Sequence, residues 1–172
     1  MIRNVGTDTG VAMLLAMPAQ EAVRILADCE PRLSGMLLQG IAATRVATAA
    51  TILRLLRSTA AGRVFAYLRP DTAAAVLMEL NRGDALRLLD STDERTVAAV
   101  IMALPVPFAT ALLKSMDSRV RAARVLTHVR PTTAAELLRP DSEFSNAVLR
   151  HLSEPVRRQV GRHLLPGREP RE

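Results

Sequence analysis

Histidine, cysteine and acidic side chains are the groups that could give this 172-residue chain a catalytic or metal-binding chemistry. Of the three histidines, His151 and His163 lie one repeat apart, and His128 stands elsewhere. No further ligand occurs at a spacing that would complete a zinc site. Cys29 is the only cysteine and has no histidine nearby in the sequence that could activate it as a nucleophile. We therefore expect no enzyme activity, no catalytic residue and no cofactor, and we interpret the histidines as surface residues.

Residues 71–94 form one acidic block, with six Asp and Glu against two Arg. Its last acids, Asp90, Asp93 and Glu94, are weak candidate ligands for a hydrated Mg²⁺ ion, because hard cations prefer carboxylate oxygens. Acids at helix N-termini, where they complement the helix dipole, explain most of the block more simply. The sequence therefore predicts no resident metal, and these three positions are where one would bind.

The arginines dominate the charge of the chain. There are 23 Lys and Arg against 17 Asp and Glu, with a net charge of +6, and Lys114 is the only lysine. Residues 1–30 carry −2, 31–70 carry +6 with no acid at all, 71–94 carry −4 and 95–172 carry +6. Such an excess permits binding to an acidic protein, a nucleic acid or an anionic surface.

Two arginine clusters lie toward the C-terminal end, and in each the i, i+3 or i, i+4 spacing places at least two guanidinium groups on one helical face. Because guanidinium forks bind carboxylates and phosphates bidentately, these clusters are the first candidates for a partner-binding surface. The alternative is that they only keep an Ala/Leu-rich chain in solution. The near-absence of lysine and of aromatics for base stacking makes nucleic acid the less favoured partner. The cluster residues are Arg119, Arg121, Arg124, Arg157, Arg158 and Arg162.

A repeat of about 12 residues must position these side chains. The stretch 69–152 contains RPDTAAAVLMEL, PVPFATALLKSM and RPTTAAELLRP, each with polar or turn residues, then alanines, then a large apolar residue. The closing residues Leu68 and Leu80 are 12 apart, as are Leu104 and Met116. A fixed internal period of this kind indicates a repeat architecture in which no unit buries its apolar face alone.

Each unit leaves room for a helix of roughly ten residues, about 14 Å long, which is marginal in isolation and needs neighbours. Apolar residues make up 49% of the chain and aromatics 2%, so aliphatic side chains and alanine must build the core. No segment alternates at the period of a strand. The predicted fold is all-α, a right- or left-coiled α-solenoid of short antiparallel helices, about 12 residues per unit.

Helix boundaries follow from prolines, glycines and capping patterns. Gly40 is expected to close one unit, and 41–57 is the longest uninterrupted helical pattern. Capping boxes are predicted at 91–94 and at 133–136, where Ser or Thr precedes Glu by three residues. The uncharged stretch 96–113 approaches the length of a membrane span. Because it contains two prolines, we expect two short buried helices there and no transmembrane segment.

The domain organisation predicted from these patterns is a flexible N-terminus over 1–10, a helical-repeat domain over 11–165 and a disordered C-terminal tail over 166–172. The first 17 residues resemble a secretory leader only vaguely, because an acid interrupts the basic start and no clean cleavage site follows. A single cysteine agrees with a reducing compartment. The expected location is therefore the cytoplasm.

The units RPDTAAAVLMEL, LPVPFATALLKSM and RPTTAAELL resemble those of the cytosolic N-terminal domain of MgtE-type magnesium transporters, over roughly residues 13–165. The resemblance implies a superhelix of short helices and a role in regulation through contact with another protein. In that family the domain is acidic, shares Mg²⁺ with an adjoining regulatory module, and is followed by a membrane domain. This chain is basic and is expected to stand alone, so no metal ligand is transferred to a position here.

Three functions remain open from the sequence. The first is a non-enzymatic helical-repeat module, regulatory or scaffolding, that binds a protein with an acidic or apolar surface. The second is a basic solenoid that binds nucleic acid or an anionic surface, and the third is a divalent-cation sensor for Mg²⁺. Homo-oligomers are compatible with all three.

Overall fold

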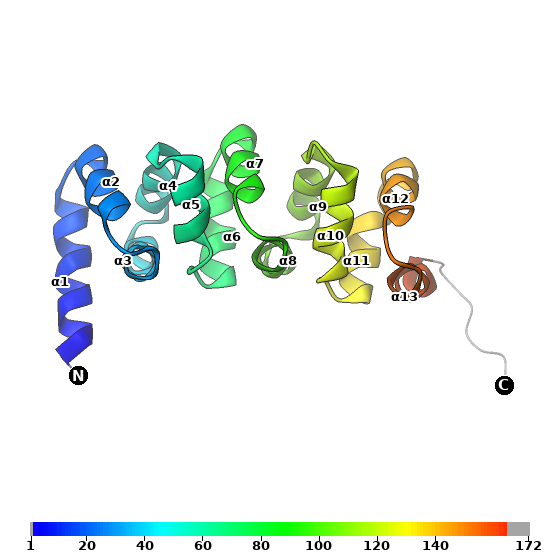
Figure 1. Cartoon of the computed structure of the whole chain (residues 1–172), viewed down its shortest axis with the longest axis horizontal. Helices are drawn as coiled ribbons and strands as arrows, with labels where there is room; N and C mark the ends of the chain where they lie inside the picture. Colours follow the sequence, from blue (N-terminus) through cyan, green and yellow to red (C-terminus); the bar gives the residue numbers. More distant parts are fainter. Residues whose placement is uncertain (1, 165–172) are drawn as a thin grey trace. The chain divides into compact units, whose positions relative to one another are not determined.

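The computed structural model describes residues 2–164 (Figure 1). Over this range the chain forms thirteen α-helices and no strand, which confirms the all-α prediction. The helices belong to two compact units, unit 1 (Met1–Thr96) and unit 2 (Val97–Glu172), and the boundary falls in the first turn of α8. The predicted tail over 166–172 lies outside the described residues.

Unit 1 contains seven complete helices among its described residues: α1 (Ile2–Ala16), α2 (Ala19–Asp28), α3 (Pro31–Thr44), α4 (Val46–Leu55), α5 (Ser58–Phe65), α6 (Pro70–Glu79) and α7 (Arg82–Asp90). Unit 2 begins within α8 (Glu94–Ala103). It continues over its described part with α9 (Val106–Ser115), α10 (Arg119–Thr127), α11 (Pro131–Leu138), α12 (Ser142–Leu149) and α13 (Glu154–Leu164).

Within each unit, most helices pack on the helix two places along the chain. In unit 1, α1 contacts α3, α2 contacts α4, α3 contacts α5, α4 contacts α6 and α5 contacts α7. In unit 2, α9 contacts α11, α10 contacts α12 and α11 contacts α13. This pattern of second-neighbour contacts is the solenoid-like arrangement that the 12-residue period predicts. The helix α1 begins at Ile2, ahead of the start expected at residue 11.

Alanines at the middle of the helices form the core together with aliphatic residues. Ala49, Ala73, Ala85, Ala109 and Ala134 all have an exposed fraction of 0%. A side chain of one methyl group lets neighbouring helix backbones approach closely, so the alanines that precede each closing residue have a packing role. The closing residues Leu68, Leu104, Met116, Val129 and Leu152 are buried. Leu80 is only half-buried, because it lines a surface hollow.

The predicted boundary at Gly40 is wrong. Helix α3 continues through this glycine to Thr44, and the break falls at Arg45, so the pattern over 41–57 is divided between α3 and α4. A Cβ atom at Gly40 would lie 2.6 Å from Cγ2 of Val11 on α1. The glycine is therefore a site of close contact between α1 and α3 and not a helix end.

Both predicted capping boxes are also wrong in their details. Helix α8 is capped by Asp93, whose Oδ1 accepts the Thr96 N–H at 3.0 Å, while the Ser91 hydroxyl donates to the carbonyl of Leu88. Thr133 lies inside α11, whose N-cap is Arg130 and makes no side-chain capping bond. The stretch 96–113 does form two short helices, α8 and α9, as predicted.

Candidate interaction surfaces

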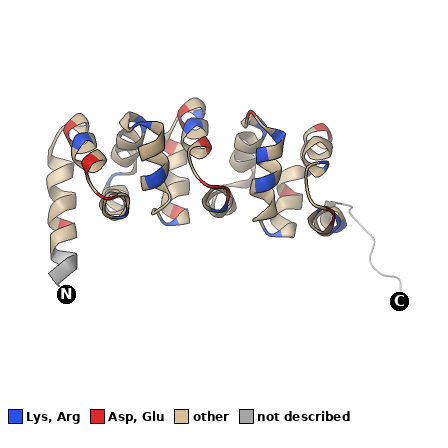
Figure 2. Cartoon of the chain, viewed as in Figure 1, with Lys and Arg blue, Asp and Glu red and all other residues tan. Residues whose placement is uncertain are grey.

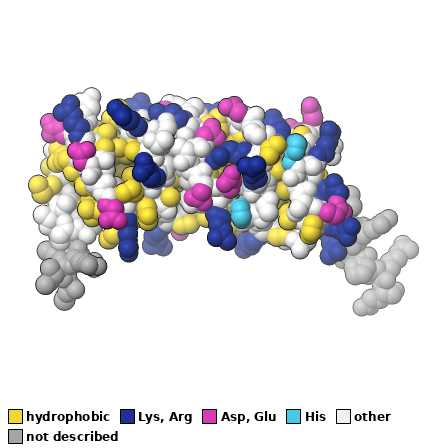
Figure 3. All heavy atoms as spheres, in the orientation of Figure 1, with side chains coloured by type: hydrophobic (Ala, Val, Ile, Leu, Met, Phe, Trp, Pro, Cys, Tyr) yellow, Lys and Arg dark blue, Asp and Glu magenta, His cyan; other side chains and the backbone are white. Residues whose placement is uncertain are grey.

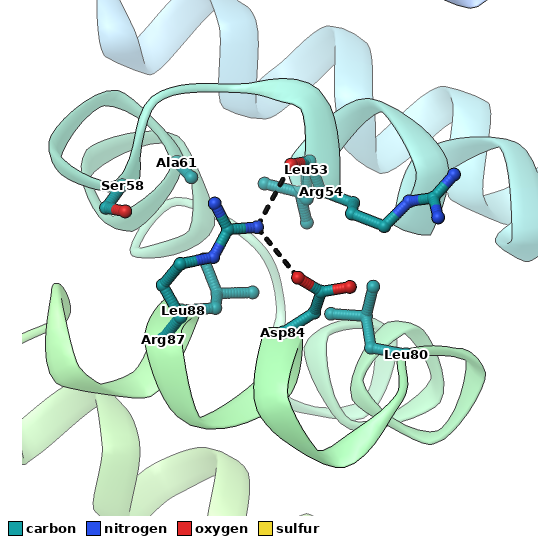
Figure 4. Close-up of a pocket in the computed structure, with 8 residues that line it drawn as sticks. All are labelled: Leu53, Arg54, Ser58, Ala61, Leu80, Asp84, Arg87 and Leu88. Carbon is teal, nitrogen blue, oxygen red and sulfur yellow. Dashed lines mark hydrogen bonds and ion pairs between the residues drawn. The ribbon is translucent and has the colours of Figure 1, made fainter.

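A hollow on unit 1 lies where α4, α5, α6 and α7 meet (Figure 4). Leu53, Leu80 and Leu88 line it with apolar surface. Figure 4 shows the Arg87 guanidinium pointing into it, where Nη2 donates to the Arg54 carbonyl at 3.0 Å and to Asp84 Oδ1 at 2.9 Å. That carbonyl belongs to the last turn of α4, where the helix provides no N–H group to bind it. Arg87 therefore caps α4 from α7.

A second hollow, open and of about 360 Å³, adjoins the first and shares Arg54 and Leu80 with it. Glu79 and Asn81 add polar groups to its wall. Asn81 is the N-cap of α7, because its Oδ1 accepts the Asp84 N–H at 2.9 Å. Beyond the Arg87–Asp84 pair, the two hollows together carry one basic side chain, Arg54, and one acidic side chain, Glu79, so the groove has no strong preference for one sign of charge.

The corresponding hollow in unit 2 lies between α9, α10 and α12. Lys114 Nζ lies 2.5 Å from Asp141 Oδ2, and Asp141 Oδ1 accepts the Phe144 N–H at 2.9 Å to cap α12. Arg119 Nη1 donates to the carbonyls of Lys114 and Met116, and its guanidinium lies 5.1 Å from the centre of the Phe144 ring. The hydrogen bond from Lys114 and that from the Phe144 N–H hold the pKa of Asp141 below its usual value.

Corresponding positions in the first hollow of unit 1 and the hollow of unit 2 are five 12-residue units apart. Sixty residues separate Arg54 from Lys114, and sixty separate the helix-capping residues Asn81 and Asp141. In unit 1 the Arg54 carbonyl, in the last turn of α4, accepts a hydrogen bond from Arg87 of α7. In unit 2 the Lys114 carbonyl, in the last turn of α9, accepts one from Arg119 of α10. In both hollows the polar side chains therefore join one helix to another.

The two arginine clusters predicted from the sequence differ in the contacts that their arginines make. Arg119 is used for capping, as described, and Arg121 is half-buried, while Arg124 is exposed. In the second cluster, Arg157 and Arg158 both bind Glu154, the latter with Nε 2.8 Å from Oε1. These partners, the hydrogen bond from Arg158 first, lower the pKa of Glu154. Arg162 is exposed. Each cluster therefore presents one exposed arginine that makes none of these contacts.

The acidic block serves helix termini at several positions. Asp93 caps α8, and hydrogen bonds from the Thr96 hydroxyl and then the Thr96 N–H lower its pKa. Glu94 lies in the first turn of α8, and Asp90 is the last residue of α7. Among the described residues, no three His, Cys, Asp or Glu side chains come close enough together to hold a metal ion.

The arginines of 31–70 are a candidate binding group that was not among the predicted site residues, although their excess charge is evident in the sequence. This range contains six arginines and no acid, and none of the six forms a salt bridge within residues 2–164. Figure 2 shows no acidic residue on α4 or α5. The signal was available in the sequence, because five of the six have no carboxylate three or four residues away and therefore no helical partner, and the sixth, Arg32, has Asp28 on the preceding helix. The residues are Arg32, Arg45, Arg54, Arg57, Arg63 and Arg69.

Comparison with known proteins gives a single kind of match. A family model described as the MgtE intracellular N domain matches residues 44–139, which is more than half of the chain. Neither the comparison with curated proteins nor that with solved structures yields a match. None of the helices within residues 2–164 combines the length and apolar character needed to cross a membrane. With the repeat and the second-neighbour helix packing described above, the family match shows that the chain belongs to the MgtE intracellular N domain family.

Proposed function

We propose that this protein is a non-enzymatic regulatory module, acting in the cytoplasm, that binds an acidic surface of another protein. The observation that carries the proposal is the set of six arginines in 31–70, which have no acid among them and no salt bridge within the described residues. Elsewhere in the chain, Arg87, Arg157 and Arg158 each bind a nearby carboxylate. What sets 31–70 apart from the rest of the chain is that no acid lies within it, so nothing in the segment offsets its six positive charges.

An acidic protein fits this segment better than a nucleic acid does. All six basic residues are arginines, whose planar forks match carboxylates. The described part of the segment exposes one aromatic side chain, Tyr67, whereas binding to single-stranded nucleic acid depends on rows of stacking aromatics. Membership of a family of intracellular domains supports a role in contact with other protein modules.

The test is capture of partner proteins from an extract of the native host by the full chain and by two charge-reversed variants. The first variant carries Arg32→Glu, Arg45→Glu and Arg63→Glu, all at exposed positions of the positive segment. The second carries Arg124→Glu, Arg150→Glu and Arg162→Glu, which are exposed positions of unit 2. Both changes alter the net charge equally, so they separate a local surface from a general attraction.

We expect proteins captured from an extract of the native host to be lost from the first variant and retained by the second. Capture should fall as salt is raised, since exposed charges are screened beyond about 8–10 Å near physiological ionic strength. Circular dichroism should show that both variants remain folded. If both variants capture the same proteins as the parent chain, or if nuclease treatment removes the captured material, the proposal is wrong.

A further inference from the structure

Unit 1 has an exposed apolar strip inside its positive segment. Leu33 and Met36, which are neighbours on α3 at a spacing of i, i+3, have exposed fractions of 44% and 46%. Tyr67, directly after α5, is 54% exposed. Figure 3 shows hydrophobic side chains at the surface where α1, α2 and α3 lie. Single exposed apolar residues are common on protein surfaces and need no explanation. Several large ones in one region do.

Gly35 brings Tyr67 next to this strip. A Cβ atom at Gly35 would lie 2.4 Å from Cβ of Tyr67 and 3.4 Å from its Cγ. The tyrosine can therefore lie against α3 only because residue 35 has no side chain. Met36 follows Gly35 in the chain, and Arg32 is one helical turn before Met36, so both belong to the part of α3 against which Tyr67 packs.

The backbone next to Tyr67 is held firmly. The Gln39 side chain on α3 accepts the Arg69 N–H through Oε1 at 3.0 Å and donates through Nε2 to the Thr72 hydroxyl at 2.6 Å. These two bonds join α3 to the start of α6, just after Tyr67 in the chain. A surface that is already ordered loses less entropy when a partner binds.

Two exposed arginines lie one helical turn from residues of the strip in the sequence. Arg32 precedes Met36 by four residues on α3, and Arg63 precedes Tyr67 by four residues at the end of α5. Neither forms a salt bridge within residues 2–164, and Arg63 makes only a 3.4 Å bond from Nε to the Thr59 carbonyl. The surface therefore combines an apolar centre with a positive border. We name it the Tyr67 surface: Arg32, Leu33, Met36, Arg63 and Tyr67.

We infer that the Tyr67 surface docks an acidic amphipathic segment of a partner protein, with the partner's apolar face on Met36 and Tyr67 and its carboxylates on Arg32 and Arg63. The inference rests on the proposed function and assigns it a location and a ligand chemistry. Tyrosine, methionine and arginine are the residue types enriched in protein interfaces, where lysine is depleted. The range 31–70 contains no lysine.

A lipid surface fits the same residues less well. Membrane-surface binding uses one amphipathic helix with a continuous apolar face and several basic residues on its border. Here the apolar residues come from two elements, and α3 carries a single basic residue, Arg32. Their spacing is fixed by the packing of α3 on α5, which suits a shaped partner.

Tyr67 also supplies the measurement, because it is the only tyrosine and the chain has no tryptophan. Its emission reports this surface without a label. The probe is a helical peptide of about 18 residues, roughly 27 Å long, with glutamates on one face and leucines on the other. Its controls are a shuffled peptide of the same composition, a lysine–leucine helix and vesicles of phosphatidylglycerol in phosphatidylcholine.

We expect the glutamate–leucine helix to change the Tyr67 emission saturably and reversibly with salt, and the shuffled and lysine peptides to have little effect. Leu33→Ser with Met36→Ser, and separately Arg32→Glu with Arg63→Glu, should each weaken binding by about tenfold. The matched control Arg124→Glu with Arg162→Glu should not. Circular dichroism should show native helicity for all three variants.

The absence of a saturable response to the glutamate–leucine helix would overturn the inference, as would an equal loss in the Arg124/Arg162 control. A response to the vesicles without one to the peptide would assign the surface to lipid instead. The proposed function is tested apart from this inference. If the triple arginine variant loses the captured partner while Arg32→Glu with Arg63→Glu and Leu33→Ser with Met36→Ser both keep it, the loss depends on Arg45 and the partner binds the positive segment outside the Tyr67 surface.

Discussion

At the scale of single residues, two glycines in unit 1 have opposite roles although both lie within helices. Gly62 on α5 faces the end of α7, and a Cβ atom there would lie 2.1 Å from the Ser91 carbonyl oxygen. Gly83 on α7 has only the Asn81 side chain within 4 Å, at 3.5 Å. The first glycine allows two helices to meet, whereas the second only weakens its own helix.

Gly62→Ala should therefore destabilise the protein and Gly83→Ala should stabilise it. Alanine raises helix stability by roughly 0.5–1 kcal/mol over glycine. At Gly62 this gain is outweighed by overpacking against backbone atoms, which typically costs about 1–3 kcal/mol. Urea unfolding of both variants measures the free energies. A Gly62→Ala protein as stable as the Gly83→Ala protein would contradict the close contact of α5 with α7.

Arginine shows most clearly what sequence spacing cannot predict at this scale. The spacing of Arg119, Arg121 and Arg124 predicts a shared helical face, but it does not show that Arg119 reaches back to two carbonyls of the preceding helix end. The pairing of Arg157 and Arg158 with Glu154 was readable, because the acid lies three and four residues before them. Contacts within a helix are predictable in this way, and contacts between helices are not.

At the scale of elements, the salt bridge between Lys114 of α9 and Asp141 at the start of α12 joins two helices of unit 2. The pKa of Asp141 is lowered, first by the hydrogen bond from Lys114 and then by the Phe144 N–H. A carboxyl group with a lowered folded-state pKa stabilises the protein above its unfolded pKa of about 3.9. That stabilisation is lost as the pH falls through the lower, folded-state value.

Asp141→Asn should lower the melting temperature at pH 7, and the difference from the parent chain should shrink below about pH 4. Asparagine retains the helix cap but cannot form the ion pair, so the variant isolates the charge. Lys114→Met should give the same pH profile, because it removes the same pair from the other side. Thermal melts across the acid range test this, and a pH-independent difference would contradict it.

The acidic block on α6, α7 and the start of α8 gives a prediction about magnesium. Asp93 accepts hydrogen bonds from Thr96, and Asp84 binds Arg87, so both carboxylates already have partners. Millimolar Mg²⁺ should therefore raise the melting temperature no more than NaCl of equal ionic strength. A saturable, Mg²⁺-specific rise that Asp90→Asn with Asp93→Asn abolishes would contradict this and favour a cation sensor.

Element boundaries show which local signals were decisive. The expectation that prolines mark helix boundaries agrees with the structure, since Pro31, Pro70 and Pro131 each occupy the first turn of a helix. Gly40 misled because a glycine that ends a helix and a glycine that admits a neighbouring helix look alike in sequence. Only the position of Val11, which packing determines, distinguishes them.

At the scale of the whole molecule, the 12-residue period predicted the fold because it reflects burial directly. Every second helix must cover an apolar face, and the alanines and closing residues record that requirement along the chain. The sixty-residue correspondence was harder to read, because Arg54 and Lys114, and Asn81 and Asp141, share roles rather than identities. Function was harder still to predict from the sequence, because a charged binding surface depends on which arginines form ion pairs once the chain has folded.

The shared core of unit 2 can be tested by placing a charge in it. Leu104, at the end of α8, is 6% exposed, and Leu104→Asp would bury a carboxylate without a partner. That costs several kcal/mol, comparable to the roughly 5–15 kcal/mol that stabilises a whole domain. Because helices of about ten residues are marginal alone, we expect circular dichroism to show a loss of helicity larger than α8 itself accounts for.

Val120→Asp is the matched control, at a position 42% exposed in the first turn of α10, where an acid complements the helix dipole. A native-like melting curve for Leu104→Asp would contradict a core shared between repeats.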